Sequence, residues 1–221
     1  LFSGCGGFSL GFQMEGFKPS LAIEIDQWAS ETYSYNHPKI PVLTKDIRKI
    51  DPIKLNLKNI DGIIGGPPCQ GFSGIGIRRS YSVEKIDIPT NHLFQEMIRV
   101  INRIQPKAFL FENVQGLLSA RWSKGGESGE IFRDVWKAFS SIDGYISQPT
   151  LLHAYGFGVP QNRPRVMIMG IKENILNKTG IEATHFDYTK KASNFREQLY
   201  NNGGLFPTWE NIAPSVEDAI S

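Results

Sequence analysis

Short apolar runs alternate with stretches of helical periodicity along most of the chain. Five runs predict strands, at residues 21–25, 60–64, 108–111, 151–152 and 166–169. Apolar residues recur at helical spacing over 93–104 and again over 131–139. Asp26 is placed to begin a further helix that runs through Tyr35, and Pro106 ends the helix over 93–104.

Strands that alternate with helices are typical of an α/β fold with a doubly wound, mostly parallel sheet. Such sheets bind ligands at the carboxyl ends of their strands. The loops that follow residues 2, 25, 64 and 111 therefore form the expected ligand site.

Two stretches depart from this alternation. Residues 74–91 are polar, carry Arg78, Arg79 and Lys85, and predict a mobile loop. Residues 172–210 show no clear period and predict a surface excursion or a linker. The chain opens at Leu1 with a Gly-rich turn that almost no strand precedes, so we expect a piece of a longer protein.

Composition excludes several classes of protein. A hydrophobic content of 40% and a charged content of 21% are ordinary for a soluble globular protein, and no stretch is long and apolar enough for a membrane span. The two cysteines, Cys5 and Cys69, have neither the spacing of a metal site nor the number of a disulfide framework. A reducing, intracellular setting is the simpler interpretation. The net charge of +2 is compatible with a polyanionic partner but is weak evidence for one.

Cys69 lies in a stiff loop directly after an expected buried strand. The loop reads Gly65-Gly66-Pro67-Pro68-Cys69-Gln70-Gly71-Phe72-Ser73. Pro68 fixes its own φ and pushes Pro67 into an extended conformation, while the glycines allow close approach of another group. The segment taken alone fits either a positioned nucleophile or a proline-rich turn around a structural cysteine.

A Gly-rich turn and two strand-end acids favour an adenosyl ligand. The turn Phe2-Ser3-Gly4-Cys5-Gly6-Gly7-Phe8 fits neither the dinucleotide fingerprint nor a phosphate-binding P-loop. Glu24 is placed to accept hydrogen bonds from a ribose, and Asp46 from the amino group of adenine. Taken singly, the Gly-rich segment is also compatible with a plain tight turn, Glu24 with a solvated acid at a strand end, and Asp46 with a cap of the next turn.

Two later segments add candidate catalytic groups. Glu112-Asn113-Val114 follows the apolar strand 108–111, where partial desolvation favours a protonated carboxyl and a proton-donating role near neutral pH. A pair of residues that caps a helix is the alternative. In Gln161-Asn162-Arg163-Pro164-Arg165, the two arginines stand at alternate positions of an extended segment and point the same way. They fit a phosphate, the acids of a site, or a plain surface salt bridge.

Four of these segments, in their order along the chain, resemble the motifs of the cytosine-C5 DNA methyltransferases: Leu1–Gly7, Gly66–Ser73, Glu112–Val114 and Gln161–Arg165. The resemblance covers residues 1 to about 171 and implies the Rossmann-like fold of S-adenosylmethionine-dependent methyltransferases. It implies S-adenosylmethionine as methyl donor, S-adenosylhomocysteine as product and no metal. The implied cofactor contacts are Phe2, Ser3, Gly4, Gly6, Gly7, Glu24, Ile25, Asp46, Pro68 and Leu93.

The same resemblance implies the catalytic roles. Cys69 matches the nucleophile that adds to the pyrimidine, and Glu112 matches the acid over the ring. Arg163 and Arg165 match the pair that supports the target base. Further contacts with substrate are implied for Gln70, Ser73, Asn113, Val114, Arg78 and Arg79.

The resemblance implies double-stranded DNA as substrate, with the target cytosine flipped out of the helix. A bacterial modification methylase of this type is expected to be a monomer in the cytoplasm, associated with the nucleoid, and to have a possible cognate restriction endonuclease. We expect residues 1–171 to form the S-adenosylmethionine-binding catalytic domain, without its first strand and final motifs. Residues 172–221 would then be an excursion or linker that leads to a target-recognition region absent from the sequence.

Three other functions fit some of these features. One branch of the family methylates cytosine in tRNA, although Ser73, where that branch usually has threonine, favours DNA. A non-catalytic cofactor-binding or DNA-binding subunit is a second alternative, against which the intact Cys69, Glu112, Arg163 and Arg165 argue. An unrelated Rossmann-like cysteine enzyme is the third, and the ordered motifs argue against it. As an incomplete catalytic domain, the chain alone is expected to be inactive or nearly so.

Overall fold

The computed structural model describes residues 1–68 and 92–208. Cys69, Gln70, Ser73, Arg78 and Arg79, which the sequence assigns to catalysis or substrate binding, lie outside the described residues.

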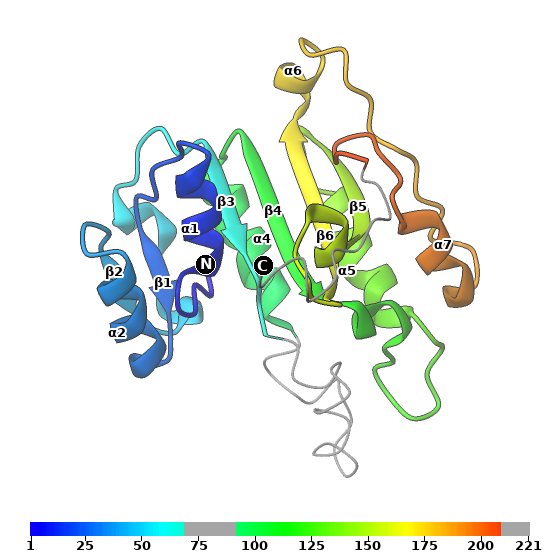
Figure 1. The fold of residues 1–221 in the computed structure, drawn as a ribbon, viewed down its shortest axis with the longest axis horizontal. Helices are drawn as coiled ribbons and strands as arrows, with labels where there is room; N and C mark the ends of the chain where they lie inside the picture. The colour runs from blue at the N-terminus through cyan, green and yellow to red at the C-terminus, as the bar shows by residue number, and fades with distance from the viewer. Residues whose placement is uncertain (69–91, 209–221) are drawn as a thin grey trace.

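The strands lie side by side in one layer of the molecule (Figure 1). A pair of parallel strands, β1 (Ala22–Glu24) and β2 (Val42–Thr44), is followed across the layer by a four-stranded sheet. The sheet has the order β3 (Gly62–Gly65), β4 (Ala108–Val114), β6 (Pro164–Lys172) and β5 (Tyr145–His153). Residues 1–3 connect the two sheets, because the nitrogen of Leu1 donates to the Ile64 carbonyl at 2.8 Å and that of Ser3 to the Ile23 carbonyl at 3.2 Å.

One strand runs against the others. β3 and β4 are parallel, whereas β6 pairs antiparallel with both β4 and β5, so that β3, β4 and β5 point the same way. The expected mostly parallel sheet is confirmed, with β6 as its reversed member. The reversal places the start of β6 at the carboxyl end of β4, where Arg165 lies opposite Val114.

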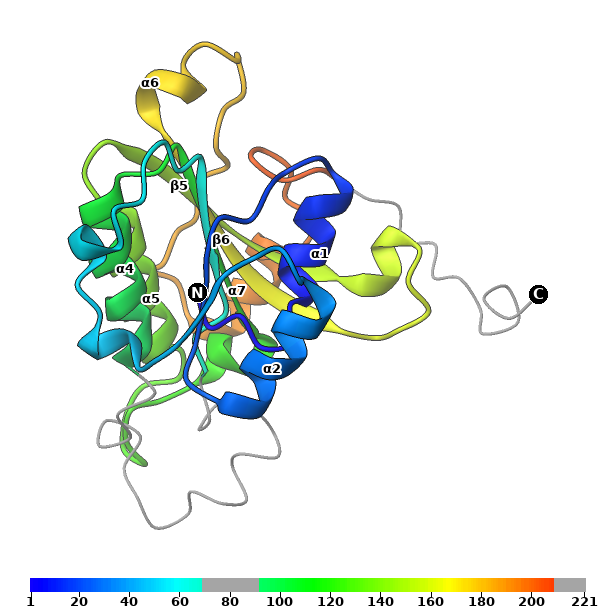
Figure 2. The same ribbon diagram turned by 90° about the vertical axis from the view of Figure 1, so that its left-hand side faces the viewer.

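Helices cover both faces of this layer (Figure 2). The helices α1 (Gly7–Met14) and α2 (Gln27–Asn36) lie on one face, and α4 (Leu93–Ile104) and α5 (Glu130–Ser140) lie on the other. This arrangement confirms the doubly wound α/β fold. The shorter helices are α6 (Glu173–Leu176), α7 (Phe195–Leu199), η1 (Ile47–Lys49), η2 (Pro52–Leu55), η5 (Gln115–Ser119), η6 (Ala154–Phe157) and η7 (Ala192–Asn194). Over the residues described, none of these helices reaches the length and apolarity that a bilayer crossing needs.

The helix boundaries follow the signals in the sequence. Asp26 caps α2, because its Oδ1 accepts a hydrogen bond from the Ala29 nitrogen at 2.8 Å. α4 buries the stripe Phe94, Met97, Val100 and Ile101 and ends at Gln105, which has a φ of 54° directly before Pro106.

β4 is longer than the apolar run predicts. The strand was expected to end at Phe111 and instead continues through Val114, because Glu112, Asn113 and Val114 all pair with β6. Glu112 is therefore a residue within the strand, not in the loop that follows it. The alternating burial along β4 places Phe111 and Asn113 on one face and Glu112 and Val114 on the other.

Residues 173–206, where the sequence predicts an excursion or a linker, pack against α5 and β5. Phe186, Phe195 and Leu199 are buried in the same hydrophobic core as Phe132 of α5. Phe195 has no exposed side-chain surface, and its ring lies 5.7 Å from that of Phe132.

Polar contacts hold the backbone of this segment in place. Arg133 of α5 donates to the carbonyls of Tyr188 and Lys190, at 3.0 Å each. The Oε1 of buried Gln148 in β5 accepts from the nitrogens of Thr184 at 2.7 Å and Leu205 at 2.8 Å. The segment is therefore fixed to the sheet by buried groups from α5 and β5.

Candidate active site

A cavity of about 500 Å³ opens at the carboxyl ends of β3 and β4. Three parts of the chain line it: the Gly-rich turn, the ends of β3 and β4, and the segment that joins β5 to β6. The lining includes Phe2, Ser3, Gly7, Gly66, Glu112, His153, Arg163 and Arg165. Residues that the sequence assigns separately to a cofactor and to a pyrimidine thus share one cavity.

The Gly-rich turn, residues 2–7, has an open backbone, and we call it the glycine cradle. Phe2, Gly4 and Gly6 have positive φ values of 54°, 50° and 95°. A Cβ added at Gly4 or Gly7 would meet no atom within 4 Å, so the backbone faces open space at both positions. A ligand can therefore approach the backbone of this turn closely at Gly4 and Gly7.

Gly6 fixes the turn against α2. A Cβ at Gly6 would lie 2.2 Å from Nε2 of His37, and the same nitrogen is 3.1 Å from the Gly6 carbonyl oxygen. Asn36 donates to the Cys5 carbonyl at 2.9 Å. Only glycine fits at position 6, and the Gly-rich turn packs against the carboxyl end of α2 through Asn36 and His37.

Glu24 joins the turn to the start of α2. Its Oε2 accepts from the Gly4 nitrogen at 2.8 Å, and its Oε1 accepts from the nitrogens of Ile25 at 2.8 Å and Asp26 at 3.1 Å. The carboxylate is therefore held directly beside the cradle, where the sequence places a ribose.

Three other expected cofactor residues, Ile25, Pro68 and Leu93, do not line the cavity. Ile25 is 62% exposed, as a residue that packs on a bound ring would be in the free protein. Pro68 is exposed after β3, and Leu93 is partly buried at the start of α4.

Asp46 has a partner that the sequence interpretation does not include. Nη2 of Arg48 lies 2.6 Å from its Oδ2, and the Arg48 backbone nitrogen donates to its Oδ1 at 3.0 Å. The guanidinium lowers the pKa of the Asp46 carboxyl, chiefly through the side-chain hydrogen bond. Asp46 is thus an ionised acceptor that Arg48 already occupies.

Glu112 and Arg165 form the centre of the cavity. Nε of Arg165 lies 2.6 Å from Oε1 of Glu112, in an ion pair whose N–H is not aligned as a hydrogen bond. Arg165 Nη1 donates to the Pro164 carbonyl at 2.8 Å, which fixes the guanidinium at the start of β6. Arg163 is exposed and lines the same cavity.

The root of the Cys69 loop touches Glu112. A Cβ added at Gly66 would lie 2.9 Å from Oε2 of Glu112. Nδ2 of Asn113 donates to the Pro67 carbonyl at 3.2 Å, and the Asn113 side chain is buried. Asn113, for which the sequence predicts a contact with substrate, is therefore seen to hold the backbone two residues before Cys69.

His153 is a cavity residue that the sequence interpretation missed. It ends β5, is 7% exposed, and its ring lies 4.9 Å from that of Tyr155 and 5.5 Å from that of Tyr200. Burial lowers the pKa of its imidazole; a hydrogen bond with Asn162 opposes this shift and the charge of Arg196 adds to it. The only sequence signal for His153 was that it directly follows the apolar run Leu151-Leu152, at the end of an expected strand.

The cavity has the size of a small-molecule site. It brings the carboxyl of Glu112 and the guanidinium groups of Arg163 and Arg165 into one cavity with residues of the Gly-rich turn. Where side chains are described, no three His, Cys, Asp or Glu residues gather in a way that could hold a metal ion.

A doubly wound sheet with a reversed strand and a glycine turn is the fold of S-adenosylmethionine-dependent methyltransferases. Among solved structures, a DNA modification methyltransferase encoded within a prophage of E. coli matches with a TM-score of 0.67 and 29% identity, over 99% of this chain and 52% of that one. A Spodoptera frugiperda DNMT2 mutant matches with a TM-score of 0.63 and 22% identity, over 86% of this chain and 54% of that one, and shows the fold alone.

The chain belongs to the C-5 cytosine-specific DNA methylase family, whose family model matches residues 1–213. It is 44% identical to the type II methyltransferase M.DdeI of Desulfomicrobium norvegicum, over 79% of this chain and 40% of that protein. It is 38% identical to M.FnuDI of Fusobacterium nucleatum, over 98% of this chain and 57% of that protein. The chain thus spans about half the length of these two curated relatives. M.AquIA of Picosynechococcus is 38% identical over the whole chain, which covers 86% of that protein.

Proposed function

We propose that this chain carries the S-adenosylmethionine-binding and catalytic part of an enzyme that methylates C5 of cytosine in double-stranded DNA. The observation that carries the proposal is the place of Glu112. Its carboxyl lies 2.6 Å from Arg165 and against Gly66 at the root of the Cys69 loop, in a cavity shared with Phe2, Ser3 and Gly7.

The glycine cradle fits the methyl donor. The backbone at Gly4 and Gly7 faces open space, and the Glu24 carboxylate lies beside it, within reach of ribose hydroxyls. S-adenosylmethionine, when bound, supplies an electrophilic methyl group. Its contacts would come from Phe2, Ser3, Gly4, Gly6, Gly7, Glu24, Ile25, Asp46, Pro68 and Leu93.

The chemistry assigned to this chain begins with the thiolate of Cys69. C5 of cytosine is a poor nucleophile, and attack of the thiolate on C6 makes C5 electron-rich. Glu112 takes up a proton from solvent when the base separates it from Arg165 and gives that proton to N3, which balances the charge of the adduct, while Arg165 donates to the O2 carbonyl. After C5 gains the methyl group, it loses its proton to solvent, the C6–S bond breaks, and the N3 proton returns to Glu112.

The guanidinium groups of Arg163 and Arg165 supply the positive surroundings that favour thiolate at position 69. The base must leave the duplex to reach this cavity. Gln70, Ser73, Asn113 and Val114 are assigned to the flipped nucleotide, and Arg78 and Arg79 to phosphates.

Relatives named type II methyltransferases support a role in restriction–modification, with a possible endonuclease that acts on the same DNA site. We assign the protein to the bacterial cytoplasm, at the nucleoid, as a monomer. Because the chain spans about half of these two relatives, residues 1–221 alone are assigned little or no turnover. Residues 1–171 are assigned to the catalytic domain, and the described part of 172–221 packs on it before the region that would recognise the target.

A methyl-transfer assay tests the proposal with the full-length protein and duplex DNA. Cys69→Ser should abolish methylation and leave S-adenosylmethionine binding intact, because it removes only the nucleophile. Ser20→Ala, at an exposed position before β1, is the control for a substitution outside the site. The unsubstituted protein should also form a covalent adduct with DNA that contains 5-fluorocytosine.

Three results would contradict the proposal. Methylation by Cys69→Ser would move the nucleophile elsewhere. Methylation of tRNA in place of duplex DNA would assign the protein to the RNA branch. A full-length protein that binds cofactor but never forms the adduct would be a non-catalytic subunit.

A further inference from the structure

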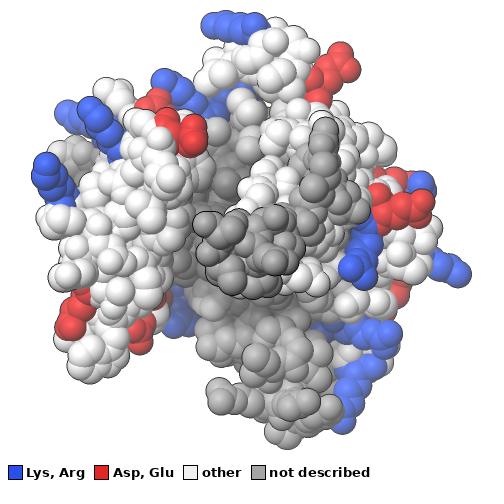
Figure 3. Space-filling model, in the orientation of Figure 1, with Lys and Arg blue, Asp and Glu red and all other residues white. Residues whose placement is uncertain are grey.

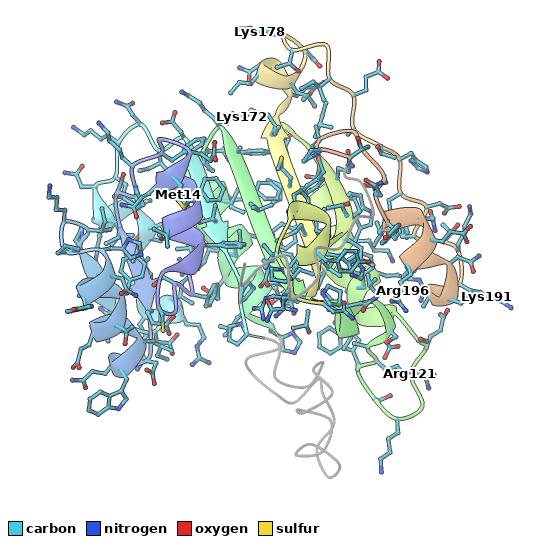
Figure 4. All side chains as sticks on the ribbon, viewed as in Figure 1. Met14, Arg121, Lys172, Lys178, Lys191 and Arg196 are labelled. Carbon is cyan, nitrogen blue, oxygen red and sulfur yellow. The ribbon has the colours of Figure 1, made fainter. Side chains whose placement is uncertain are left out.

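Three exposed cations lie on two neighbouring segments, η5 with the loop after it and η7 with the start of α7. Arg121 follows η5, and Lys191 and Arg196 flank η7 at the start of α7. Figure 4 labels all three around α7 and the loop after η5, and Figure 3 shows blue side chains along this edge of the molecule. We call Arg121, Lys191 and Arg196 the α7 basic patch.

The patch sits on a rigid support. With the amide of Gln115 oriented to place its oxygen toward α7, Oε1 accepts from Nη2 of Arg196 at 3.0 Å and from Nε at 2.5 Å. Phe195, next to Arg196, is fully buried, and Arg133 fixes the carbonyl of Lys190, next to Lys191. Lys191 and Arg196 therefore project from backbone that packing holds in place.

The neighbouring acids are already engaged. Glu127 pairs with Arg133 at 3.1 Å, and Asp134 accepts from Nε1 of Trp122 at 2.8 Å. Glu197 adjoins Arg196 in α7, but consecutive residues of a helix do not face each other. Within the described part of the chain, the α7 basic patch forms no ion pair with a carboxylate.

The patch begins close to the reacting groups. Gln115, which contacts Arg196, begins η5 three residues after Glu112, so the Cα atoms of Gln115 and Glu112 are at most about 10 Å apart. Along one DNA strand, about 10 Å of helix axis corresponds to about three nucleotides.

We propose that the α7 basic patch binds backbone phosphates of duplex DNA, about three nucleotides from the target cytosine. This inference rests on the proposed function and adds a binding surface to it. Arginine pairs with phosphate through two parallel N–H groups, and Gln115 leaves the remaining donors of Arg196 free to do so. These contacts position the duplex and carry no sequence information.

The test measures affinity for duplex DNA at several salt concentrations, with the full-length protein and its Arg121→Ala, Lys191→Ala and Arg196→Ala variants. Each substitution should weaken binding to all sequences alike and lower the slope of log affinity against log salt by about 0.9. Arg196→Lys should retain the slope, because it retains the charge. Lys178→Ala, at the opposite edge beside α6 (Figure 4), is the matched control and should change neither quantity.

The outcomes separate this inference from the function beneath it. If the protein binds and methylates duplex DNA while the patch variants behave like Lys178→Ala, the patch assignment is wrong and the function stands. If the protein neither binds nor methylates duplex DNA, the proposed function fails and the inference fails with it. Thermal unfolding midpoints equal to that of the unsubstituted protein show that each variant is folded.

Discussion

At the scale of single residues, Glu112 is held from two sides. Arg165 contacts one carboxylate oxygen at 2.6 Å, and the missing side chain of Gly66 leaves room for the other. The neighbouring residue, Asn113, fixes Pro67, so the acid and the loop that carries Cys69 are positioned by adjacent residues of β4. Small changes here should alter the chemical step more than the fold, because reacting groups tolerate little displacement.

We expect Gly66→Ala to slow methyl transfer about 100-fold in single-turnover experiments with the full-length protein, because its Cβ would lie 2.9 Å from Oε2 of Glu112 and displace the carboxyl group. Gly62→Ala, at the start of β3, is the matched control, since its Cβ would meet only the Ala108 carbonyl, at 3.8 Å. Equal rates for the two variants would show that Glu112 does not need this position.

The sequence motifs predict which residue types act, but not every contact between them. Glu112 and Arg165 are 53 positions apart, and only the pairing of β4 with β6 shows that they touch. The same limit explains why His153 was missed. For Asp46, the interpretation found the acid but not its neighbour Arg48, because an exposed arginine two residues away gives no signal of its own.

At the scale of elements, caps and turns set the geometry of the cofactor side. α2 begins at Asp26, and the same corner contains Glu24, which binds the Gly4 nitrogen. The carboxyl end of α2 supports the turn through His37. Residues at both ends of α2, Glu24 before it and His37 after it, thus contact the glycine cradle.

Asp26→Ala should lower the free energy of unfolding by about 1 kcal/mol, because it removes the side-chain acceptor for the Ala29 nitrogen. Asp26→Asn should retain most of that free energy, since asparagine caps as well as aspartate. Asp143→Ala, in the exposed turn before β5, should change stability by less than about 0.5 kcal/mol. Urea unfolding of the three variants measures this, and a cap substitution without effect would show that packing alone fixes the start of α2.

At the scale of the whole molecule, residues 173–206 complete the core behind the sheet. The ring of Phe195 lies 5.7 Å from Phe132 and 5.3 Å from Phe186, and Arg133 stacks over it at 5.2 Å. These contacts join the last described segment to α5. The α7 basic patch takes its fixed position from the same packing.

Phe195→Ala should lower the free energy of unfolding by about 3–5 kcal/mol, the usual loss for a buried phenylalanine. Ile181→Ala in the same segment should change it by less than about 0.5 kcal/mol, because Ile181 is 50% exposed. Chemical unfolding followed by circular dichroism distinguishes the two. A small effect of Phe195→Ala would mean that residues 173–206 are not part of the cooperative unit.

The sequence by itself determined the class of fold, the positions of β1, β3, β4 and β6, the helices α2, α4 and α5, and the motifs that name the family. These features depend on local periodicity, caps and ordered residue types, which neighbours in the chain are sufficient to specify. The tertiary structure decided that β6 runs backwards and brings Arg165 to Glu112, that β4 extends through Val114, and that residues 173–206 belong to the core. Each of these features depends on strand pairing or burial between segments far apart in the chain. The local sequence pattern of one segment does not specify which distant segment it will pair with or pack against.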